Sequence, residues 1–399
     1  MRILHVVRQF YPAVGGLEDF VLSLAKQQRQ EGLSPEVVTL NRLTRGPAEI
    51  LSPREIVEGI PVRRIGYVGP PKYPVAPSVL KHVSEFDLIH VHAVDFFCDY
   101  LGMTRFLHQK PLVLSTHGGF FHTRYAQTFK KLFFSTVTRL TMTRYQCIVA
   151  NSVNDLDLFR RITKKRLVMI ENGVNTLKFA GSASATFKPG FVYIGRFASN
   201  KGLYKLVEAF DVLANQRPDA RLHIVGNDFD NLLSPLQDRI AALSNGAKIK
   251  VHVGLSDEDL RAVMRECSFF VSASEYEGFG QTVVEAMSAG LLPIVNRIPS
   301  FEKIIGATNI GRLTDFSSPN AAAMDAAELM SWTEQHHAEA RSAAVAASAS
   351  YSWETTARRF TEAYESVTGA GSGGRDTAHD RQSRTRDAAE QDGFVQHSA

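Results

Sequence analysis

A pattern of short apolar segments separated by longer helical or loop segments runs through this chain and occurs twice. In its first occurrence we expect a helix from Glu18 to about Gln30. The expected strands are Ile3–Arg8, Val37–Leu40, Leu88–His92, Leu112–Ser115 and Ile148–Ala150. Alternating strands and helices predict a parallel sheet with helices on both faces, which places the chain in the α/β class.

The pattern then starts again. Leu203–Asn215 is expected to be a helix because apolar residues recur on one face, at Leu206, Phe210 and Leu213. The strands expected around it are Phe191–Ile194, Leu222–Val225, Ile249–Val253, Phe269–Ser272 and Leu292–Val295. The small, polar, proline-containing stretch 181–190 separates the two occurrences and is interpreted as a linker between two similar α/β units.

The last part of the chain differs from both units. Met324–Ala349 is alanine-rich and helical, and Tyr351–Val367 predicts an amphipathic helix with Trp353, Phe360 and Tyr364 on one face. From residue 369 the chain has almost no large apolar side chains. Such a segment buries too little surface to offset its ordering entropy, so residues 369–399 are predicted to be a disordered tail.

Composition excludes several classes of protein. A net charge of +4 in 399 residues is too mild for a nucleic-acid binder, and we expect no nucleic-acid partner. The chain has no run of 18 apolar residues, and its N-terminus does not resemble a signal peptide. Three widely separated cysteines, Cys98, Cys147 and Cys267, form no metal-binding or disulfide pattern and fit buried thiols in a reducing cytoplasm.

In each unit, a glycine-containing loop follows the first strand. Gly15 and Gly16 open the first expected helix, where backbone N–H groups and the helix dipole suit an anion; an ordinary strand-to-helix turn is the alternative. This pair is not a GxGxxG dinucleotide fingerprint, which disfavours a dehydrogenase. Arg196 and Lys201 lie at the equivalent junction of the second unit, where two cations suit a diphosphate or are simply solvated.

Two carboxylates, Glu277 and Glu285, are separated by seven residues, with Phe279 and Gly280 between them. Glu277 is expected on a loop and Glu285 in the second turn of the following helix. Carboxylates accept hydrogen bonds from the vicinal hydroxyls of sugars and riboses. A general acid/base pair and unrelated surface acids remain alternatives.

Histidines mark the other candidate site. His90 and His92 point to the same side of one expected strand; we interpret them as core or surface residues rather than metal ligands. His117 follows an expected strand at the carboxyl end of the sheet, where open α/β folds place their ligands.

The order and spacing of these motifs resemble those of retaining glycosyltransferase family 4. The residues that carry this likeness are Gly15-Gly16-x-Glu18, His117-Gly118, Gly195-Arg196, Lys201-Gly202 and Glu277-x7-Glu285. The resemblance covers about residues 1–367. It implies the GT-B fold, in which two Rossmann-like domains face each other across a cleft and a C-terminal helix crosses back to the first domain.

The implied division is an acceptor-binding domain at 1–180, completed by the crossing helix 351–367, and a nucleotide-sugar-binding domain at 190–350. In the cleft, the resemblance implies that Gly15 and Gly16 face the β-phosphate while Arg196 and Lys201 hold the diphosphate. Glu277 would hold sugar hydroxyls, the Phe279 and Gly280 amides would contact sugar or phosphate, and Glu285 would bind the ribose. His117 would contact the transferred sugar. Retention and the absence of a bound metal or other cofactor are implied as well.

A closer likeness is to the bacterial mannosyltransferases that build xanthan- and acetan-type exopolysaccharides. It rests on the segments Val6–Phe10, Tyr73–Leu80, Asp95–Leu101, Ser115–Thr123 and Glu285–Gly290. It implies GDP-mannose as the donor and a cellobiose carried on a polyprenyl diphosphate as the acceptor. The alternatives are another nucleotide sugar such as UDP-glucose, a phosphatidylinositol or other glycolipid acceptor, or a non-catalytic sugar-nucleotide-binding protein.

The stretch 124–146 is basic and aromatic and contains no acidic residue. Lys130, Lys131, Phe133 and Phe134 are therefore expected to contact an anionic membrane, although a core-facing helix with a solvated basic side has the same pattern. A lipid-linked acceptor favours membrane contact. We expect a cytoplasmic protein bound peripherally to the inner face of the bacterial plasma membrane.

Overall fold

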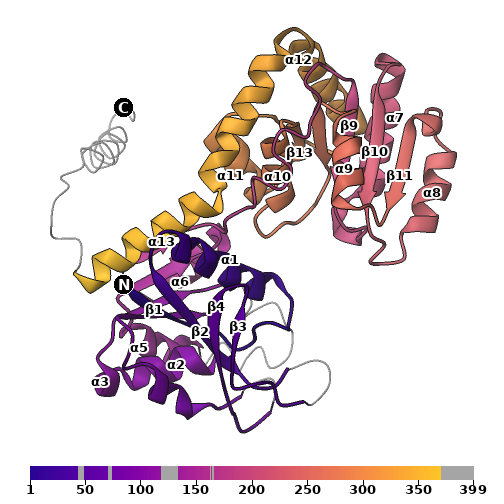
Figure 1. Cartoon of the computed structure of the whole chain (residues 1–399). Coiled ribbons are helices and arrows are strands. Elements are labelled where there is room, and N and C mark those ends of the chain that lie inside the picture. The colour runs from indigo at the N-terminus through magenta and orange to yellow at the C-terminus, as the bar shows by residue number, and fades with distance from the viewer. Residues whose placement is uncertain (44–48, 71–73, 118–133, 162, 164–165, 370–399) are drawn as a thin grey trace, which may run out of the picture.

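The computed structural model describes residues 1–43, 49–70, 74–117, 134–161, 163 and 166–369. These residues form two sheets, one of eight strands within residues 2–169 and one of six strands within residues 190–314. Figure 1 shows the two sheets with their helices as separate lobes, joined along one side by the long helices near the C-terminal end. The GT-B architecture expected from the sequence is what the structure shows.

The first sheet has the order β3-β4-β2-β1-β5-β6-β7-β8. Its strands are β1 (Arg2–Val6), β2 (Ser34–Leu40), β3 (Arg54–Val57), β4 (Ile60–Ile65), β5 (Leu88–His92), β6 (Leu112–Ser115), β7 (Cys147–Ala150) and β8 (Leu167–Met169). All pairings are parallel except that β3 runs antiparallel to β4. The sheet is parallel as predicted except at this edge, where a tight turn at Glu58 and Gly59, both with positive φ, allows a hairpin.

Helices cover both faces of this sheet, so the side chains along one buried strand alternate between two cores. In β1, Ile3 joins the core under α1 (Gly16–Gln30), while Leu4 joins the core under α2 (Phe96–Met103). This alternation explains why the strand reads as a continuous apolar run. The other helices within the described part of this lobe are η1 (Pro77–His82), α3 (Arg105–His108), η2 (Phe134–Thr138), α5 (Arg139–Met142) and α6 (Val153–Arg160).

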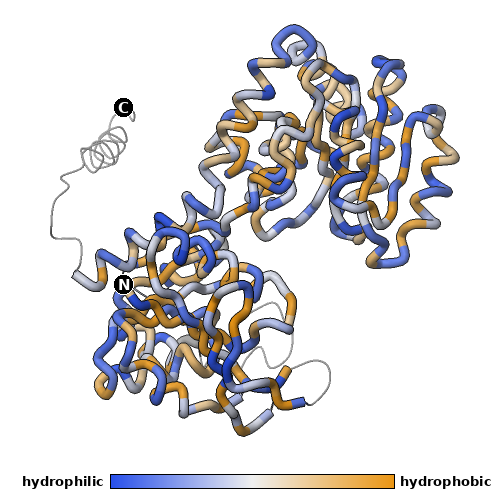
Figure 2. The backbone as a smooth tube through the Cα atoms, in the orientation of Figure 1, coloured by the Kyte–Doolittle hydropathy of each residue, from blue (hydrophilic) through white to orange (hydrophobic). Residues whose placement is uncertain are grey.

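The second sheet is entirely parallel, with the order β11-β10-β9-β12-β13-β14. Its strands are β9 (Gly190–Ile194), β10 (Arg221–Gly226), β11 (Ile249–Val253), β12 (Phe269–Ser272), β13 (Leu292–Asn296) and β14 (Arg312–Thr314). Its helices are η3 (Ser199–Lys201), α7 (Leu203–Gln216), α8 (Leu233–Ala241), η4 (Gly246–Lys248), α9 (Asp257–Met264), α10 (Gln281–Ala289), α11 (Pro299–Thr308) and α12 (Pro319–Ser348). Figure 2 shows hydrophobic residues gathered along the strands of this lobe and hydrophilic ones at its outer loops.

Strand order identifies where a ligand fits in each lobe. From the neighbouring pair β9 and β12, the chain proceeds outward in opposite directions, and β1 and β5 form the same kind of switch point in the first lobe. The loops after such strands diverge and leave a crevice, which is where open α/β sheets bind ligands. The loops carrying Lys201 and Glu277 follow β9 and β12, and the loop carrying Gly16 follows β1.

Two connections join the lobes. The stretch interpreted as a linker does not run free: Ala183 and Ser184 are buried, and the Ala183 N–H donates to the carbonyl of Ala289. Its small side chains fit against the second lobe. The return connection is α12, which has a kink at His336, then η5 (Ala349–Tyr351) and α13 (Trp353–Thr368).

The crossing helix is confirmed. Ser352 caps α13 by accepting a hydrogen bond from the Thr355 N–H, and the helix packs on α1 of the first lobe. Phe360 and Tyr364 are fully buried there, and Trp353 is partly buried against the same core. The tail 370–399 lies outside the described residues.

Candidate active site

Lys201 and Glu277 meet at the switch point of the second lobe. The Lys201 ammonium donates to Oε1 of Glu277 over 2.5 Å, and the two side chains are only 14% and 19% exposed. η3 ends at Lys201, and Glu277 follows β12, so their contact depends on the neighbouring positions of β9 and β12. The sequence placed both residues in the site but not in contact with each other.

Arg196 follows β9 on the same side but is exposed. Its guanidinium lies over the Phe229 ring, 4.6 Å from the centroid, and its carbonyl accepts a hydrogen bond from the buried Tyr193 hydroxyl. The backbone of this loop is therefore anchored while the guanidinium remains accessible to an anion.

The loop from Glu277 leads directly into α10. Gly280 adopts a φ of +98°, and a Cβ there would lie 3.0–3.2 Å from side-chain atoms of Phe301 and Ile304. Both the backbone conformation and this crowding disfavour a side chain at position 280. Phe279 packs 5.8 Å from the Tyr351 ring, next to the start of the crossing helix. α10 begins at Gln281, so its N-terminus lies four residues after Glu277 in the chain.

Glu285 lies in the second turn of α10, as predicted. Its Oε1 accepts a hydrogen bond from the Gln281 side chain over 3.0 Å. Burial raises the pKa of the Glu285 carboxyl, and the Gln281 hydrogen bond opposes that rise. A partly buried carboxylate with one amide partner keeps further capacity to accept hydrogen bonds.

In the first lobe, Gly16 begins α1 and Gly15 is the residue before it, with no side-chain cap. Neither glycine has a positive φ, and a Cβ placed on Gly16 would meet no atom within 4 Å. Packing and backbone conformation therefore do not require a glycine at position 16.

His117 follows β6 with a φ of +50°, a conformation that costs a non-glycine residue free energy. Its N–H donates to Oδ1 of Asn151 over 3.2 Å, and the Phe20 ring packs 4.6 Å from its ring. Burial lowers the pKa of His117 to about 3, which makes its imidazole neutral at physiological pH.

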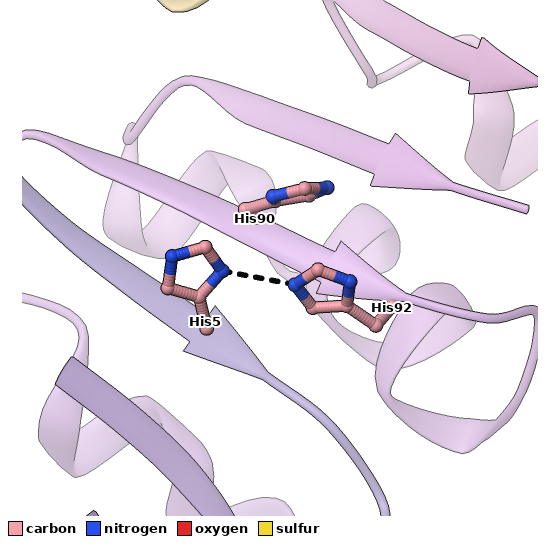
Figure 3. Close-up of side chains that lie close together, drawn as sticks. All are labelled: His5, His90 and His92. Atoms are coloured by element: carbon pink, nitrogen blue, oxygen red, sulfur yellow. Dashed lines mark hydrogen bonds between the residues drawn. The ribbon is translucent and has the colours of Figure 1, made fainter. Parts of the chain in front are cut away.

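Three further histidines lie behind it. His5 on β1 and His90 and His92 on β5 are fully buried, and Figure 3 shows their rings side by side. Their ligand nitrogens lie within 4.8 Å of one another, a spacing compatible with a metal site. However, all six ring nitrogens have hydrogen-bond partners: His5 and His92 bond to each other, and the others bond to Gln28, Ser115, His117 and Tyr364. A metal would have to displace these bonds, so the cluster fits a hydrogen-bonded core.

A cleft of about 560 Å³, open to solvent, lies between the lobes. The first lobe contributes Asn151, Ser152 and Glu171, and the second contributes Glu275–Phe279 and Ile298–Ser300 with Lys303. Lys303 pairs with Glu171 across the cleft over 2.8 Å. Asn151 thus connects the position of His117 to a cleft lined by Glu277 and Phe279. The other predicted site residues that the structure describes do not line it: Gly15, Gly16, His117, Arg196, Lys201, Gly280 and Glu285.

Asn151 and Lys303 were not identified from the sequence. Asn151 directly follows a buried strand, a position that could have indicated it. Lys303 is one of many helix-surface lysines and carries no comparable signal.

The membrane prediction falls largely outside the described residues. Lys130, Lys131 and Phe133 are not described, and Phe134 is described only as the first residue of η2. Within the described part of the chain, no helix is long and apolar enough to cross a membrane.

Two facing α/β lobes, a crossing helix and a polar cleft define a GT-B glycosyltransferase. Two family models match the chain, glycosyltransferase family 4 over residues 14–177 and glycosyl transferases group 1 over residues 175–346. The chain belongs to glycosyltransferase family 4.

Individual comparisons agree with this assignment. The chain is 40% identical to the GDP-mannose:cellobiosyl-diphosphopolyprenol alpha-mannosyltransferase of Xanthomonas oryzae pv. oryzae over 92% of this chain and 98% of that protein. It is 38% identical to the enzyme of the same name from Komagataeibacter xylinus over 92% and 94%. A glycosyltransferase from Rickettsia africae superposes with a TM-score of 0.68 at 20% identity, covering 92% of this chain and 98% of that one.

Proposed function

We propose that this enzyme transfers mannose from GDP-mannose, with retention of configuration, to a cellobiose carried on a polyprenyl diphosphate. The observation that carries the proposal is similarity at 38–40% identity over nearly the full length of enzymes named for this reaction. The cleft supports it, because the ammonium of Lys303, the carboxylates of Glu171 and Glu277 and the amide of Asn151 line it.

We propose the following roles for the site residues. Lys201 and Arg196 bind the diphosphate and stabilise the charge that grows on the departing nucleotide. Glu277, oriented by Lys201, accepts hydrogen bonds from sugar hydroxyls. The Gly15, Gly16, Phe279 and Gly280 backbones lie at helix N-termini suited to phosphate or sugar oxygens. Glu285 binds the ribose and His117 the transferred mannose.

The proposed chemistry uses one face of the sugar. An oxocarbenium-like state forms as the bond to the phosphate breaks, and the leaving phosphate helps to take the proton of the acceptor hydroxyl. Glu277 is not assigned as a nucleophile, since its carboxylate is held by an ammonium that would lower its nucleophilicity. We propose that no metal takes part, because Lys201 and Arg196 supply the positive charge.

The division of labour between the lobes is part of the same proposal. Residues 1–180 with 351–367 bind the acceptor, and residues 190–350 bind the nucleotide sugar. The two sheets lie within these ranges.

A donor panel tests the function. The purified enzyme is incubated with membranes carrying the lipid-linked disaccharide and, separately, with labelled GDP-mannose, UDP-glucose or UDP-galactose. We expect transfer from GDP-mannose alone, with an α-linked product. Transfer from a UDP-sugar alone would contradict the mannosyl assignment.

Peripheral contact with the anionic inner face of the plasma membrane is the second part of the proposal. Between Asp99 and Asp155 the chain has no acidic residue and seven basic ones. They are Arg105, Lys110, Arg124, Lys130, Lys131, Arg139 and Arg144. Each basic residue near an anionic surface contributes about 1 kcal/mol of attraction.

Exposed apolar side chains lie in the same region. Phe106 and Leu107 on α3 are 73% and 62% exposed, and Leu140 on α5 is 68% exposed. α2 packs against both helices, and Figure 1 shows the three together at one end of the first lobe. Apolar side chains amid basic ones suit an anionic lipid surface.

Vesicle flotation tests this surface. Phe106→Glu together with Leu107→Glu should reduce binding to anionic vesicles strongly, and binding of the wild type should weaken with salt. Ile56→Glu is the matched control, because Ile56 is also 73% exposed in the first lobe but lies on β3. Normal flotation of the double variant would exclude this surface.

A further inference from the structure

A continuous hydrogen-bonded array runs from the crossing helix to His117 through the buried core of the first lobe. The Gln28 amide Nε2 donates to the Tyr364 hydroxyl over 3.1 Å, and its Oε1 lies 2.8 Å from Nε2 of His5. His5 Nδ1 lies 2.9 Å from Nε2 of His92, shown as the dashed line in Figure 3. His92 Nδ1 lies 3.2 Å from Nε2 of His117.

The orientation of the Gln28 amide, with Nε2 toward Tyr364 and Oε1 toward His5, sets the direction of each hydrogen bond. An amide oxygen only accepts, so His5 donates from Nε2 to Gln28. Full burial lowers the pKa of His5 to about 4, and burial also lowers the pKa of His92 well below its ordinary value. Both rings are therefore neutral at pH 7, and each has one N–H and one acceptor nitrogen.

The consequence passes from ring to ring. Because the hydrogen of His5 is on Nε2, its Nδ1 accepts from Nε2 of His92. His92 Nδ1 then accepts in turn, and the donor facing it is Nε2 of His117. A neutral His117 with its hydrogen on Nε2 has its lone pair on Nδ1.

The other end of the array is equally constrained. The Tyr364 hydroxyl accepts from Gln28 and therefore uses its own hydrogen toward Nδ1 of His90, 2.8 Å away. His90 then donates from Nε2 to the Ser115 hydroxyl over 2.7 Å. Every donor in the array thus faces an acceptor. Because Tyr364 lies on α13, the orientation of the Gln28 amide depends on how α13 packs on the first lobe.

We propose that Gln28 and Tyr364, acting through His5 and His92, are positioning residues that hold His117 in the tautomer with hydrogen on Nε2 and the acceptor nitrogen Nδ1. The catalytic consequence rests on the proposed contact of His117 with the transferred sugar: Nδ1 then accepts a hydrogen bond from a sugar hydroxyl. Since Tyr364 belongs to the crossing helix, correct docking of that helix and the acceptor state of His117 are coupled.

Nitrogen-15 spectra of the histidine rings test the tautomer in the free enzyme at neutral pH. Protonated and unprotonated ring nitrogens have distinct shifts, and the His117 signals are identified by their loss in His117→Gln. In the wild type we expect Nε2 of His117 protonated and Nδ1 unprotonated. The reverse assignment would overturn the proposal.

Two variants test the array itself. Gln28→Met and Tyr364→Phe should shift His117 toward a mixture of tautomers and lower kcat by about fivefold, the change that one lost buried hydrogen bond produces, with KM nearly unchanged. Tyr145→Phe is the matched control, because it removes a buried hydroxyl bonded to the Cys98 carbonyl outside the array. An unchanged His117 tautomer in both test variants would refute the proposal.

The spectra separate this inference from the proposed function, because they need no substrate. If the tautomer follows the array but no mannose is transferred, the function fails and the array stands. If mannose is transferred but the tautomer is insensitive to both variants, the array fails alone.

Discussion

Replacing Lys201 by methionine tests the proposed cation at the switch point of the second lobe most directly. The change keeps the aliphatic stem and removes the ammonium that lies 2.5 Å from Glu277. We expect kcat to fall by about 10²–10³, the loss measured when one preorganised group facing transition-state charge is removed.

The same change should also destabilise the fold. The Glu277 carboxylate is 19% exposed and would lose its cationic partner. Leaving a largely buried acceptor unsatisfied costs about 1–3 kcal/mol. Urea unfolding measures this cost, and initial rates of transfer from GDP-mannose measure kcat.

Adding Glu277→Gln distinguishes the two effects. The double variant no longer contains an unpaired carboxylate, so its free energy of unfolding should recover while kcat stays low. Lys205→Met is the matched control: Lys205 pairs with Glu275 over 2.6 Å, but both side chains are exposed, and such pairs contribute about 0–1 kcal/mol. Its kcat should stay within about twofold of wild type, since it removes no group facing transition-state charge.

Two results would refute the reasoning. If Lys201→Met has wild-type turnover, the diphosphate binds elsewhere. If the double variant regains turnover, Lys201 acts only by neutralising Glu277.

Three further predictions concern metal dependence, chain length and pH. Excess EDTA should leave transfer largely intact because protein cations supply the charge; complete loss restored by Mg²⁺ or Mn²⁺ would contradict this. Ending the chain after Thr368 should leave folding and activity nearly unchanged. Ending it before Tyr351 removes α13, uncovers the core of the first lobe and should give insoluble protein. The solubility and activity of the two truncated proteins test this prediction. Urea unfolding should show that the free energy of unfolding falls from pH 7 to pH 5. Burial lowers the pKa values of His5 and His117 in the folded protein to about 4 and about 3, below the pKa of an unfolded histidine. The unfolded chain therefore takes up protons first as the pH falls, which favours unfolding. Each of these two histidines should lower the free energy of unfolding by about 2 kcal/mol over this range. Asp95, whose pKa burial raises to about 6, has the opposite effect. Equal stability at the two pH values would show that the histidines are not buried.

The local pattern of the sequence was enough to predict two α/β units and an amphipathic helix at 351–367, and the resemblance to family 4 implied that this helix crosses back to the first lobe. Apolar runs and helical periodicity depend on neighbours a few residues apart, so helices such as α7 and α13 were predicted almost to their ends. The resemblance to family 4 also placed Lys201 and Glu277 in one site. The edge strands β3, β8 and β14 were missed because they are short, partly exposed and lack a strong apolar run. β4 lies between β3 and β2 and was missed because Pro61, Arg63 and Arg64 interrupt its apolar residues.

The tertiary structure alone determined which polar side chains meet. Sequence reasoning treated His90 and His92 as core or surface residues, placed Tyr364 on the apolar face of a helix, and did not consider the side chains of His5 and Gln28. The structure joins them, although Gln28 and Tyr364 are 336 positions apart. No local pattern encodes such a contact, because it arises only when α1 and α13 pack over the same face of the first sheet and burial forces each polar group to find a partner. For the same reason the sequence indicated Glu277 and Phe279 as residues of the cleft, while the pairing of Lys201 with Glu277 and of Lys303 with Glu171 followed from how the sheets and lobes come together.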